Sequence, residues 1–324
     1  MMLGLSSYSL DPAIASGEMT LYDAIDWAAA QGAECMELVP FSFTFMDDER
    51  HIDSEYIKKV VRHAKDAGIK LCNYSVLVDL CKEDPDALRD EVARVKRHVD
   101  VAVELGVPVM RHDVSAFRRP HGENGLEYFE KLMPLMVESA GAIADHAAQY
   151  GITTLIENHG FFANGCDRVE RIIRAVNRPN YGLLLDTGNI ACVDEDPAVA
   201  AQRLASKAKM IHLKDFYIRK KDRMLPQDGM YTAGAKPAKP YVMPTPEEFR
   251  KMPPSLGYVG TASGLNILRG SILGQGDMDI WAILKTVKDA GYDKEVSIEF
   301  EGMEDCVAAT DICLKTARYI WDRV

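Results

Sequence analysis

Three carboxylates and one imidazole stand at the ends of four apolar, strand-like segments: Glu157, Asp186, His212 and Glu299. If these segments are neighbouring strands of one sheet, the four side chains meet at one edge of the core, where like charges repel and lose hydration. A divalent cation would neutralise them. Three oxygen ligands with one nitrogen and no thiolate suit Mn²⁺, Mg²⁺, Co²⁺ or a catalytic Zn²⁺. We therefore predict a metal centre with these four residues as ligands.

Each of the four residues, taken alone, is also explained as a solvated polar group at a strand end or as a helix cap. Their recurrence on four consecutive strands favours the metal centre over that explanation. The prediction of a metal centre holds only if the four segments are neighbouring strands, and the pattern of strands and helices along the chain decides whether they are.

The segment GITTLIENHG, residues 151–160, shows the type of strand that is involved. A short apolar run between glycines is typical of a strand buried on both faces, as in a parallel sheet covered by helices. Similar segments recur along the chain. We predict strands over residues 3–10, 34–39, 69–78, 108–113, 152–157, 181–186, 210–213 and 296–300. We predict helices over residues 21–32, 54–67, 85–105, 126–150, 167–176, 197–207, 278–290 and 304–323.

Glycines that end helices support this alternation of helices and strands. Gly32, Gly68, Gly106, Gly151 and Gly291 each stand just ahead of a predicted strand, as glycines at helix C-termini do. Strictly alternating units with right-handed crossovers form a parallel sheet, and eight units suggest closure into a barrel. An open doubly wound sheet would prefer a phosphate-binding fingerprint after the first strand, and none occurs there. We predict an α/β fold, a TIM (β/α)8 barrel formed by a single domain over residues 1–324.

Residues 216–276 interrupt the alternation between the seventh strand and its helix. The segment is rich in Pro, Gly, Lys and Tyr, and segments of this length inside a compact domain are usually lids or binding loops. It must emerge at the carboxyl ends of the strands, where active sites of such barrels lie. We expect a lid there that caps the metal, binds a larger substrate or docks another subunit.

The composition excludes several classes of protein. A net charge of −11 and a pI of about 5.3 argue against a general nucleic-acid binder. The N-terminus lacks the features of a signal peptide, and no apolar run approaches the roughly 20 residues that cross a bilayer. The 7 cysteines are scattered and occur in no CxxC spacing, which indicates reduced thiols. We therefore expect a cytoplasmic protein with no membrane and no nucleic-acid partner.

The ordered motifs of the chain resemble the xylose-isomerase-like TIM-barrel superfamily. These motifs are IENHG (156–160), LLLDTGN (183–189), IHLKD (211–215), GQGD (274–277) and SIEFEG (297–302). The superfamily includes sugar-phosphate isomerases and epimerases, ketose 3-epimerases, inosose isomerases and dehydratases, and endonuclease IV of the AP endonuclease 2 group. The resemblance covers essentially the whole chain.

The resemblance implies both ligands and catalytic residues. In ketose 3-epimerases the residues that match Glu157, Asp186, His212 and Glu299 bind one Mn²⁺- or Mg²⁺-type ion, so we expect Mn²⁺ first, with Mg²⁺, Co²⁺ or Zn²⁺ as alternatives. The two matching glutamates there also carry protons on opposite faces of the substrate. Deprotonation beside a carbonyl by one and reprotonation by the other inverts a carbon centre through an enediolate.

Two departures from the family patterns narrow the function. Endonuclease IV carries a metal-binding histidine three residues after the aspartate, where this chain has Asn189, and the acidic composition gives no DNA-binding surface. DNA repair is therefore disfavoured. Ketose 3-epimerases commonly carry a histidine in the same region, which also weakens the hypothesis of a simple free-ketose epimerase.

Further polar and aromatic residues lie near the predicted strand ends. His159 lies two residues beyond Glu157, so in extended chain it faces the same side, as a general base or as a group that supports the metal ligands. A hydrogen bond across the loop explains it equally well. The predicted substrate-binding residues, each with a structural alternative, are His112, Asn189, Lys214, Tyr8 and Tyr74. Glu37, near the end of the second strand, is interpreted as structural.

Three functional hypotheses remain. The first is a metal-dependent sugar isomerase or epimerase that acts through an enediolate on a keto- or oxo-sugar. The second is a lyase similar to the large subunit of C-glycoside deglycosidases, which eliminates an aglycone from a 3-oxo-glucoside with the aid of a small partner subunit, here with His159 as base. The third is a non-catalytic sugar-binding barrel. All three predict a sugar or glycoside ligand, and we expect an oligomer.

Overall fold

The computed structural model of the protein describes residues 1–115, 124–220 and 259–324, and the statements below concern these residues. Eight parallel strands form a closed barrel in which neighbours along the chain are neighbours in the sheet, and the last strand pairs with the first. The barrel strands are β1 (Met2–Ser6), β2 (Cys35–Leu38), β3 (Lys70–Val76), β4 (Val109–His112), β5 (Thr153–Glu157), β6 (Tyr181–Asp186), β7 (Ala208–Leu213) and β11 (Glu295–Ile298). The predicted TIM barrel is confirmed.

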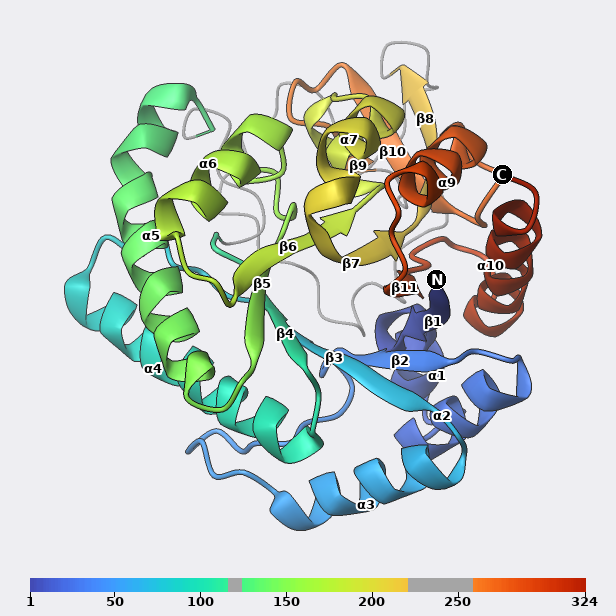
Figure 1. The fold of residues 1–324 in the computed structure, drawn as a ribbon, viewed down its shortest axis with the longest axis horizontal. Coiled ribbons are helices and arrows are strands. Elements are labelled where there is room, and N and C mark those ends of the chain that lie inside the picture. The colour runs from blue at the N-terminus through green and yellow to red at the C-terminus, as the bar shows by residue number, and fades with distance from the viewer. Residues whose placement is uncertain (116–123, 221–258) are drawn as a thin grey trace.

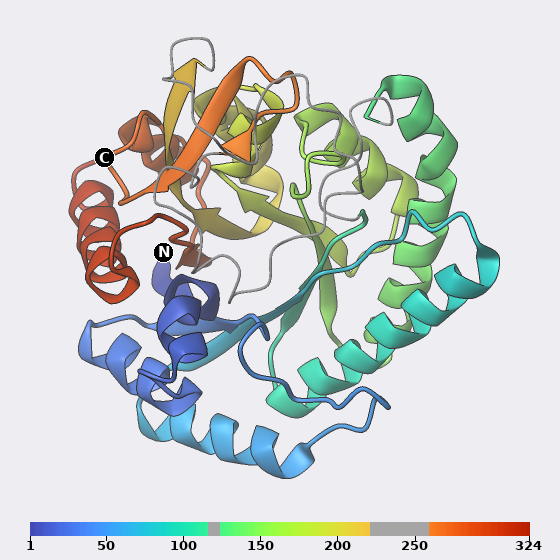
Figure 2. The ribbon, with the colours of Figure 1, turned by 180° about the vertical axis from the view of Figure 1, so that it is seen from behind.

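Helices surround the barrel on its outside, as the views from the two opposite sides show (Figures 1 and 2). Each barrel strand is followed by one of these helices: α2 (Leu21–Ala30), α3 (Ser54–Asp66), α4 (Pro85–Leu105), α5 (Leu126–Ala148), α6 (Cys166–Val176), α7 (Pro197–Leu204), α9 (Ile280–Asp289) and α10 (Cys306–Trp321). Local sequence sets their ends. At the start of α2, Thr20 and Asp23 cap each other's backbone N–H groups, and α4 ends at Gly106, whose φ of 70° favours glycine.

The sequence patterns placed most elements of the barrel correctly. The first strand differs from its prediction. The predicted first strand over residues 3–10 ends at Ser6, because the Ser6 hydroxyl accepts a hydrogen bond from the backbone of Tyr8 and starts a 3-10 helix, η1 (Ser7–Leu10). A short helix, α1 (Asp11–Ser16), follows it. Two further 3-10 turns flank α7: η3 (Asn189–Val193) and η4 (Ala205–Lys207).

The alternation of side chains along each strand separates an outer core from an inner one. The outer core lies between the barrel and the helices. The inner core is small and consists of Cys35, Cys72, Leu155, Leu184 and Met210. On four strands the next inward residue, two positions further on, is polar: Glu37, Glu157, Asp186 and His212. The barrel interior is therefore apolar at the amino ends of these strands and charged at their carboxyl ends.

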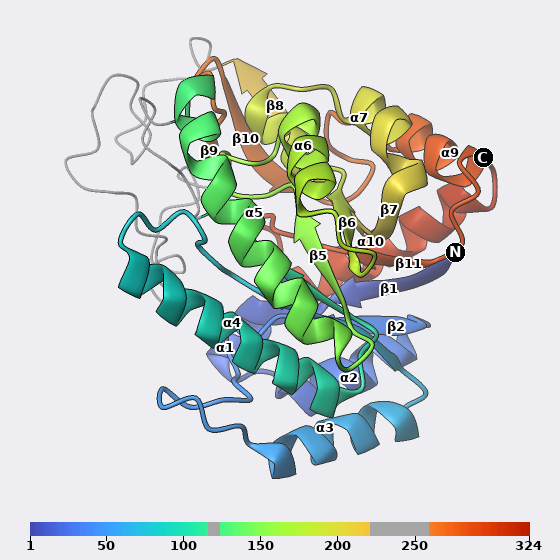
Figure 3. The ribbon, with the colours of Figure 1, turned by 60° about the vertical axis from the view of Figure 1, so that its left-hand side comes forward.

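A second sheet follows β7, within the segment that was predicted as an insertion. It is antiparallel, in the order β8 (Asp215–Lys220), β10 (Asn266–Ser271) and β9 (Val259–Gly260), and lies outside the ring of barrel strands (Figure 3). Asp215 anchors it, since its carboxylate accepts hydrogen bonds from the backbone of Gly274 and Gly276, both at 2.9 Å. The predicted lid falls largely on residues 221–258, outside the described residues. In the described part of the chain no helix is suited to spanning a membrane.

Candidate metal centre

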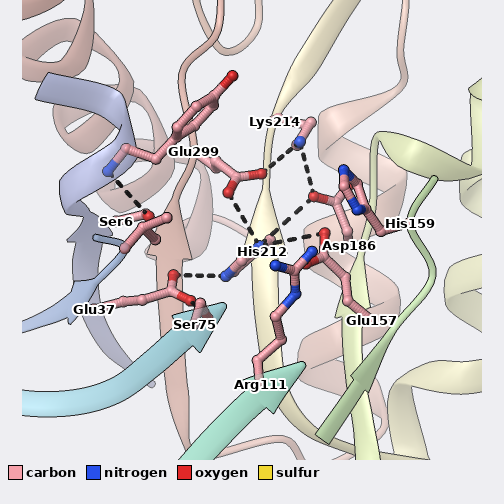
Figure 4. A network of polar contacts seen from close by, with 12 residues as sticks. Ser6, Glu37, Ser75, Arg111, Glu157, His159, Asp186, His212, Lys214 and Glu299 are labelled. Atoms are coloured by element: carbon pink, nitrogen blue, oxygen red, sulfur yellow. Dashed lines mark hydrogen bonds and ion pairs between the residues drawn. The ribbon is translucent and has the colours of Figure 1, made fainter. Parts of the chain in front are cut away.

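The four predicted ligands come together inside the barrel, at the carboxyl ends of four consecutive strands. Glu157 and Asp186 end β5 and β6, His212 lies on β7, and Glu299 directly follows β11. One ligand atom from each of the four lies within 4.8 Å of the others, and all four residues are buried (Figure 4). Residues far apart in the sequence thus form one cluster, as their placement at strand ends predicted.

His212 lies at the centre of this cluster. Glu37 holds its ring on the side away from the three acidic residues. Its Nε2 lies 2.7 Å from Glu37 Oε2, which assigns the ring proton to this nitrogen. The other oxygen of Glu37 accepts hydrogen bonds from Asn73 Nδ2, at 2.8 Å, and from the hydroxyl of Ser75. A fixed and fully buried carboxylate therefore orients the imidazole and directs Nδ1 toward the three acidic residues.

Two buried atoms of the cluster form no hydrogen bond, namely His212 Nδ1 and Asp186 Oδ2. His212 Nδ1 lies 3.8 Å from Glu157 Oε1, 3.7 Å from Asp186 Oδ2 and 3.6 Å from Glu299 Oε1. Burial disfavours the charged ring, but the carboxylates of Glu37 and Glu299 outweigh it and raise the pKa of His212 above its ordinary value. The space between these atoms thus favours positive charge, and the donor set fits a divalent cation.

The backbone after β6 holds Asp186 so that one of its oxygens faces the cluster. Asp186 Oδ1 accepts hydrogen bonds from the N–H groups of Gly188 and Asn189, both at 2.7 Å. The Asn158 side chain spans the neighbouring strand ends, since its amide bonds both the N–H and the carbonyl of Asp186 at 2.8 Å. These bonds leave Oδ2 facing His212.

Glu157 is held by two donors, one on each oxygen. Arg111 Nη2 lies 2.5 Å from its Oε2, and Asn189 Nδ2 donates to its Oε1 at 2.8 Å. Burial opposes ionisation, but the positive charge of Arg111 outweighs it and lowers the pKa of Glu157 to about 2.

The same Arg111 nitrogen lies 2.9 Å from Asp113 Oδ1, which in turn lies 3.0 Å from His159 Nδ1. Burial would keep His159 neutral, but Asp113 raises its pKa.

Lys214 is the second buried cation of the cluster and, unlike Arg111, contacts Glu299 and Asp186. Its buried ammonium lies 2.5 Å from Glu299 Oε2, 3.1 Å from Asp186 Oδ2 and 3.6 Å from Glu301 Oε2. Burial works against the charged form, but these carboxylates raise the pKa of Lys214 above its ordinary value. The lysine therefore remains a cation beside two of the metal-ligand candidates.

The structure brings three of the five predicted substrate-binding residues to the cluster. Lys214 contacts it as described, and the Asn189 amide bridges Glu157 and Lys214, whose Nζ donates to Asn189 Oδ1 at 3.3 Å. Tyr8 also lies beside the cluster. Burial of its hydroxyl and the negative charges of Glu301 and Glu299 raise the pKa of that group. Its ring packs edge-on against that of Phe41, with 5.5 Å between centroids.

His112 and Tyr74 are not brought to the cluster. His112 pairs with Ile156 of the outer core, so it faces the helices, and its ring lies 6.1 Å from that of Tyr181. Tyr74 also faces outward, and its hydroxyl lies 3.0 Å from Nδ1 of His98 on α4. We propose no substrate contact for either residue, since the pleat of their strands directs both side chains away from the barrel interior.

The sequence analysis gave no functional role to Glu37, Arg111 or Asp113. The spacing of two offered a signal for Glu37, because it follows Cys35 on the inward face just as Glu157 follows Leu155. For Arg111 the signal was present only in the pairing, which sets it beside Leu155 and therefore inside the barrel. No sequence pattern indicated that Asp113 bridges Arg111 and His159.

Solved structures of the same fold match nearly the whole chain at low sequence identity. The IOLI protein with a bound zinc atom is 17% identical over 100% of this chain and 99% of that chain, with a TM-score of 0.68. The probable 3-DHS dehydratase AsbF from Bacillus anthracis is 15% identical over 98% and 99%, with a TM-score of 0.65. The 3-keto-D-glucoside 4-epimerase YcjR from E. coli is 12% identical over 98% and 99%, also with a TM-score of 0.65.

These identities establish a shared fold and not a shared reaction. No curated protein matches the chain. Residues 25–316 match the family model that describes the xylose isomerase-like TIM barrel, which covers most of the sequence. The chain therefore belongs to the xylose isomerase-like TIM barrel family.

Proposed function

We propose that this protein is a divalent-metal-dependent sugar isomerase or epimerase that removes the proton beside a carbonyl group and forms an enediolate. The observation that carries the proposal is the convergence of Glu157, Asp186, His212 and Glu299 around the buried His212 Nδ1, which has no hydrogen-bond partner. A divalent cation bound there would supply the positive charge that stabilises the oxyanion of an enediolate. Mn²⁺ is our first choice, and the zinc reported for a protein of the same fold keeps Zn²⁺ as an alternative.

Glu299 is the proposed base. Its side chain is the most exposed of the four, at 11%, and its Oε2 pairs with the ammonium of Lys214. In the proposed reaction Glu299 takes the α-proton, the electrons of the C–H bond form the carbon–carbon double bond, and the carbonyl oxygen becomes negative. Lys214, beside that carboxylate, is placed to hold the substrate oxygen on which this charge develops.

His159 is the proposed partner that returns the proton. Its Nδ1 is held by Asp113, an arrangement that orients an imidazole for proton transfer. Glu157, for which the family resemblance implies the same role, has both oxygens engaged by Arg111 and Asn189, so we assign it to the metal. Proton return to the opposite face of the same carbon gives the epimer. Proton return to the neighbouring carbon, with transfer of the α-hydroxyl proton to the former carbonyl oxygen, gives the isomer. Asn189 and Tyr8 are proposed to contact the sugar.

A lyase is the second candidate, and the Asp113–His159 pair is the observation that favours it. The same enediolate expels a substituent on the adjacent carbon if an acid protonates the leaving oxygen or carbon, and His159 is placed for such a role. Among proteins of this fold, both an epimerase of a keto-glucoside and a probable dehydratase occur.

Deuterium exchange at the carbon beside the carbonyl separates the candidates. The protein with Mn²⁺ is incubated in D₂O with ketoses, 3-oxo-glucosides and an O- or C-glycoside of the latter, and NMR follows the label and the products. Label incorporation with an isomerised or epimerised product supports the first proposal. Release of water or aglycone assigns the lyase instead. No exchange and no product across the panel, in protein that binds Mn²⁺, would contradict both and leave the sugar-binding barrel.

A further inference from the structure

Arg111 is a buried cation that contacts two carboxylates through one nitrogen. Its Nη2 lies 2.5 Å from Glu157 Oε2 and 2.9 Å from Asp113 Oδ1, and its side chain is 6% exposed. It projects from β4 into the barrel, beside the metal centre (Figure 4). Both contacts are made by Nη2, so this nitrogen is committed to the protein's own acidic groups.

The contact with Arg111 divides the two oxygens of Glu157 between separate partners. Oε2 faces the guanidinium, whereas Oε1 faces the cluster, 3.8 Å from His212 Nδ1. Asn189 Nδ2, which donates to Oε1 at 2.8 Å, fixes the carboxylate plane from the other side. An arginine–carboxylate contact is strong and directional, so the rotation that would exchange the two oxygens is restrained.

The backbone of Arg111 is restrained as well. Its N–H donates to Asn73 Oδ1 at 3.1 Å, and Asn73 Nδ2 donates to Glu37, the residue that holds His212. Two residues outside the ligand set, Glu37 and Arg111, are thus joined by one asparagine and each restrains a different predicted ligand. Residues that orient metal ligands in this way typically change metal affinity by 10- to 100-fold when they are replaced.

We propose that Arg111 is a positioning residue that fixes Glu157 as a metal ligand through its Oε1 atom alone. This inference rests on the metal site of the proposed function. Arg111 touches neither metal nor substrate in this role and acts only through the Glu157 carboxylate. Without it, Glu157 and Asp113 lose their shared cation, and Glu157 is free to turn away from the cluster.

The test is a double-mutant cycle on Mn²⁺ affinity, measured by isothermal titration calorimetry on the full chain, without substrate. Arg111→Met should weaken Mn²⁺ binding by about 10- to 100-fold. The Glu157→Gln variant should bind weakly in either background, and Arg111→Met should add less than about twofold to it, because the arginine acts through the missing carboxylate. Arg178→Met is the control for loss of an arginine–carboxylate contact away from the cluster, since Arg178 contacts Asp145 on the surface.

Arg111→Lys covers the case in which the methionine variant does not fold, since it keeps the buried positive charge. The thermal midpoint of each metal-free variant is measured beside the affinity, because a purely structural role would lower the midpoint without depending on Glu157. Two results overturn the inference and leave the proposed function standing. One is wild-type Mn²⁺ affinity in both Arg111 variants. The other is that Arg111→Met lowers the Mn²⁺ affinity of the Glu157→Gln protein as much as that of the wild type. A wild-type protein that binds no Mn²⁺ overturns both.

Discussion

Glu299 differs from the other three residues of the metal centre in exposure and in its partners. Its side chain is 11% exposed, whereas those of Glu157, Asp186 and His212 are 2% or less. A group that takes a proton from a substrate must be reachable from the mouth of the barrel, and Glu299 is the most exposed of the four, with Lys214 beside its Oε2 atom. At the residue scale, exposure is therefore the reason to propose Glu299, and not another member of the cluster, as the base.

The Glu299→Gln variant tests this division. It removes a proton acceptor and a negative charge while keeping the shape, so exchange of the substrate α-proton should slow by about 10³-fold. The measurement is the rate of deuterium incorporation at saturating Mn²⁺. Glu295→Gln, at the other end of β11 where Glu295 pairs with Lys70, is the matched control and should stay near the wild-type rate. Near-normal exchange in Glu299→Gln would refute the assignment of the base.

Glu37 acts on the same centre from below, and the Glu37→Gln variant tests that role. The substitution removes the negative charge that keeps the proton of the His212 ring on Nε2 and so leaves the electron pair of Nδ1 available to a metal. Mn²⁺ affinity should therefore fall by about 10- to 100-fold. Calorimetric titration measures it. Asp26→Asn is the control, because Asp26 Oδ1 lies 2.8 Å from His63 Nε2 in a similar contact on the surface. Equal affinities for both variants would show that Glu37 is only a structural residue.

At the scale of elements, the sequence predicted what depends on local pattern and missed what depends on pairing. Apolar runs and terminal glycines placed the barrel strands and their helices, and the strand ends placed the four residues of the candidate metal centre. The inward or outward direction of a side chain depends on strand pairing, which sets Arg111 beside the inward Leu155 and His112 beside the outward Ile156, and local sequence does not distinguish the two. The β8–β10 pair was missed for the same reason, since its two strands are joined only across a long segment.

The packing of α4 against β3 contains a titratable residue that makes stability depend on pH. His98 on α4 lies between the Tyr74 hydroxyl, 3.0 Å from its Nδ1, and Arg94, 3.1 Å from its Nε2. Burial and the positive charge of Arg94 lower the pKa of His98 from 6.5 to about 4. The unfolded chain therefore binds a proton between these two values and the folded chain does not, so this contribution is complete above about pH 6.5 and declines as the pH falls toward 4.

His98→Gln should remove this dependence. Between about pH 7.5 and about pH 5, the wild type should lose about 2 kcal/mol more free energy of unfolding than the variant. Urea unfolding at the two pH values, followed by circular dichroism, gives the difference. His51→Gln, a surface histidine that contacts Asp47, is the control and should keep the wild-type dependence. Parallel curves for wild type and His98→Gln would contradict the prediction.

At the scale of the whole molecule, the candidate metal centre is complete only when the barrel closes. Glu299 follows the last barrel strand, β11, which pairs with both β7 and β1. The cluster therefore forms only when β11 joins the sheet, and its buried carboxylates repel one another unless protons, Lys214, Arg111 or a metal ion balance them. A cation that binds the folded cluster and not the unfolded chain must stabilise the whole barrel.

Adding metal should therefore raise the thermal stability of the protein. At a free Mn²⁺ concentration of about 100 times the dissociation constant, mass action adds about 2.7 kcal/mol to the free energy of unfolding. For a chain of this size that raises the thermal midpoint by about 5 °C, and EDTA should reverse it. Asp186→Asn, which removes the charge at one ligand, should show little of this shift at the same concentration. An equal shift in Asp186→Asn would show that the stabilising ion binds elsewhere, because only the predicted centre needs the Asp186 carboxylate.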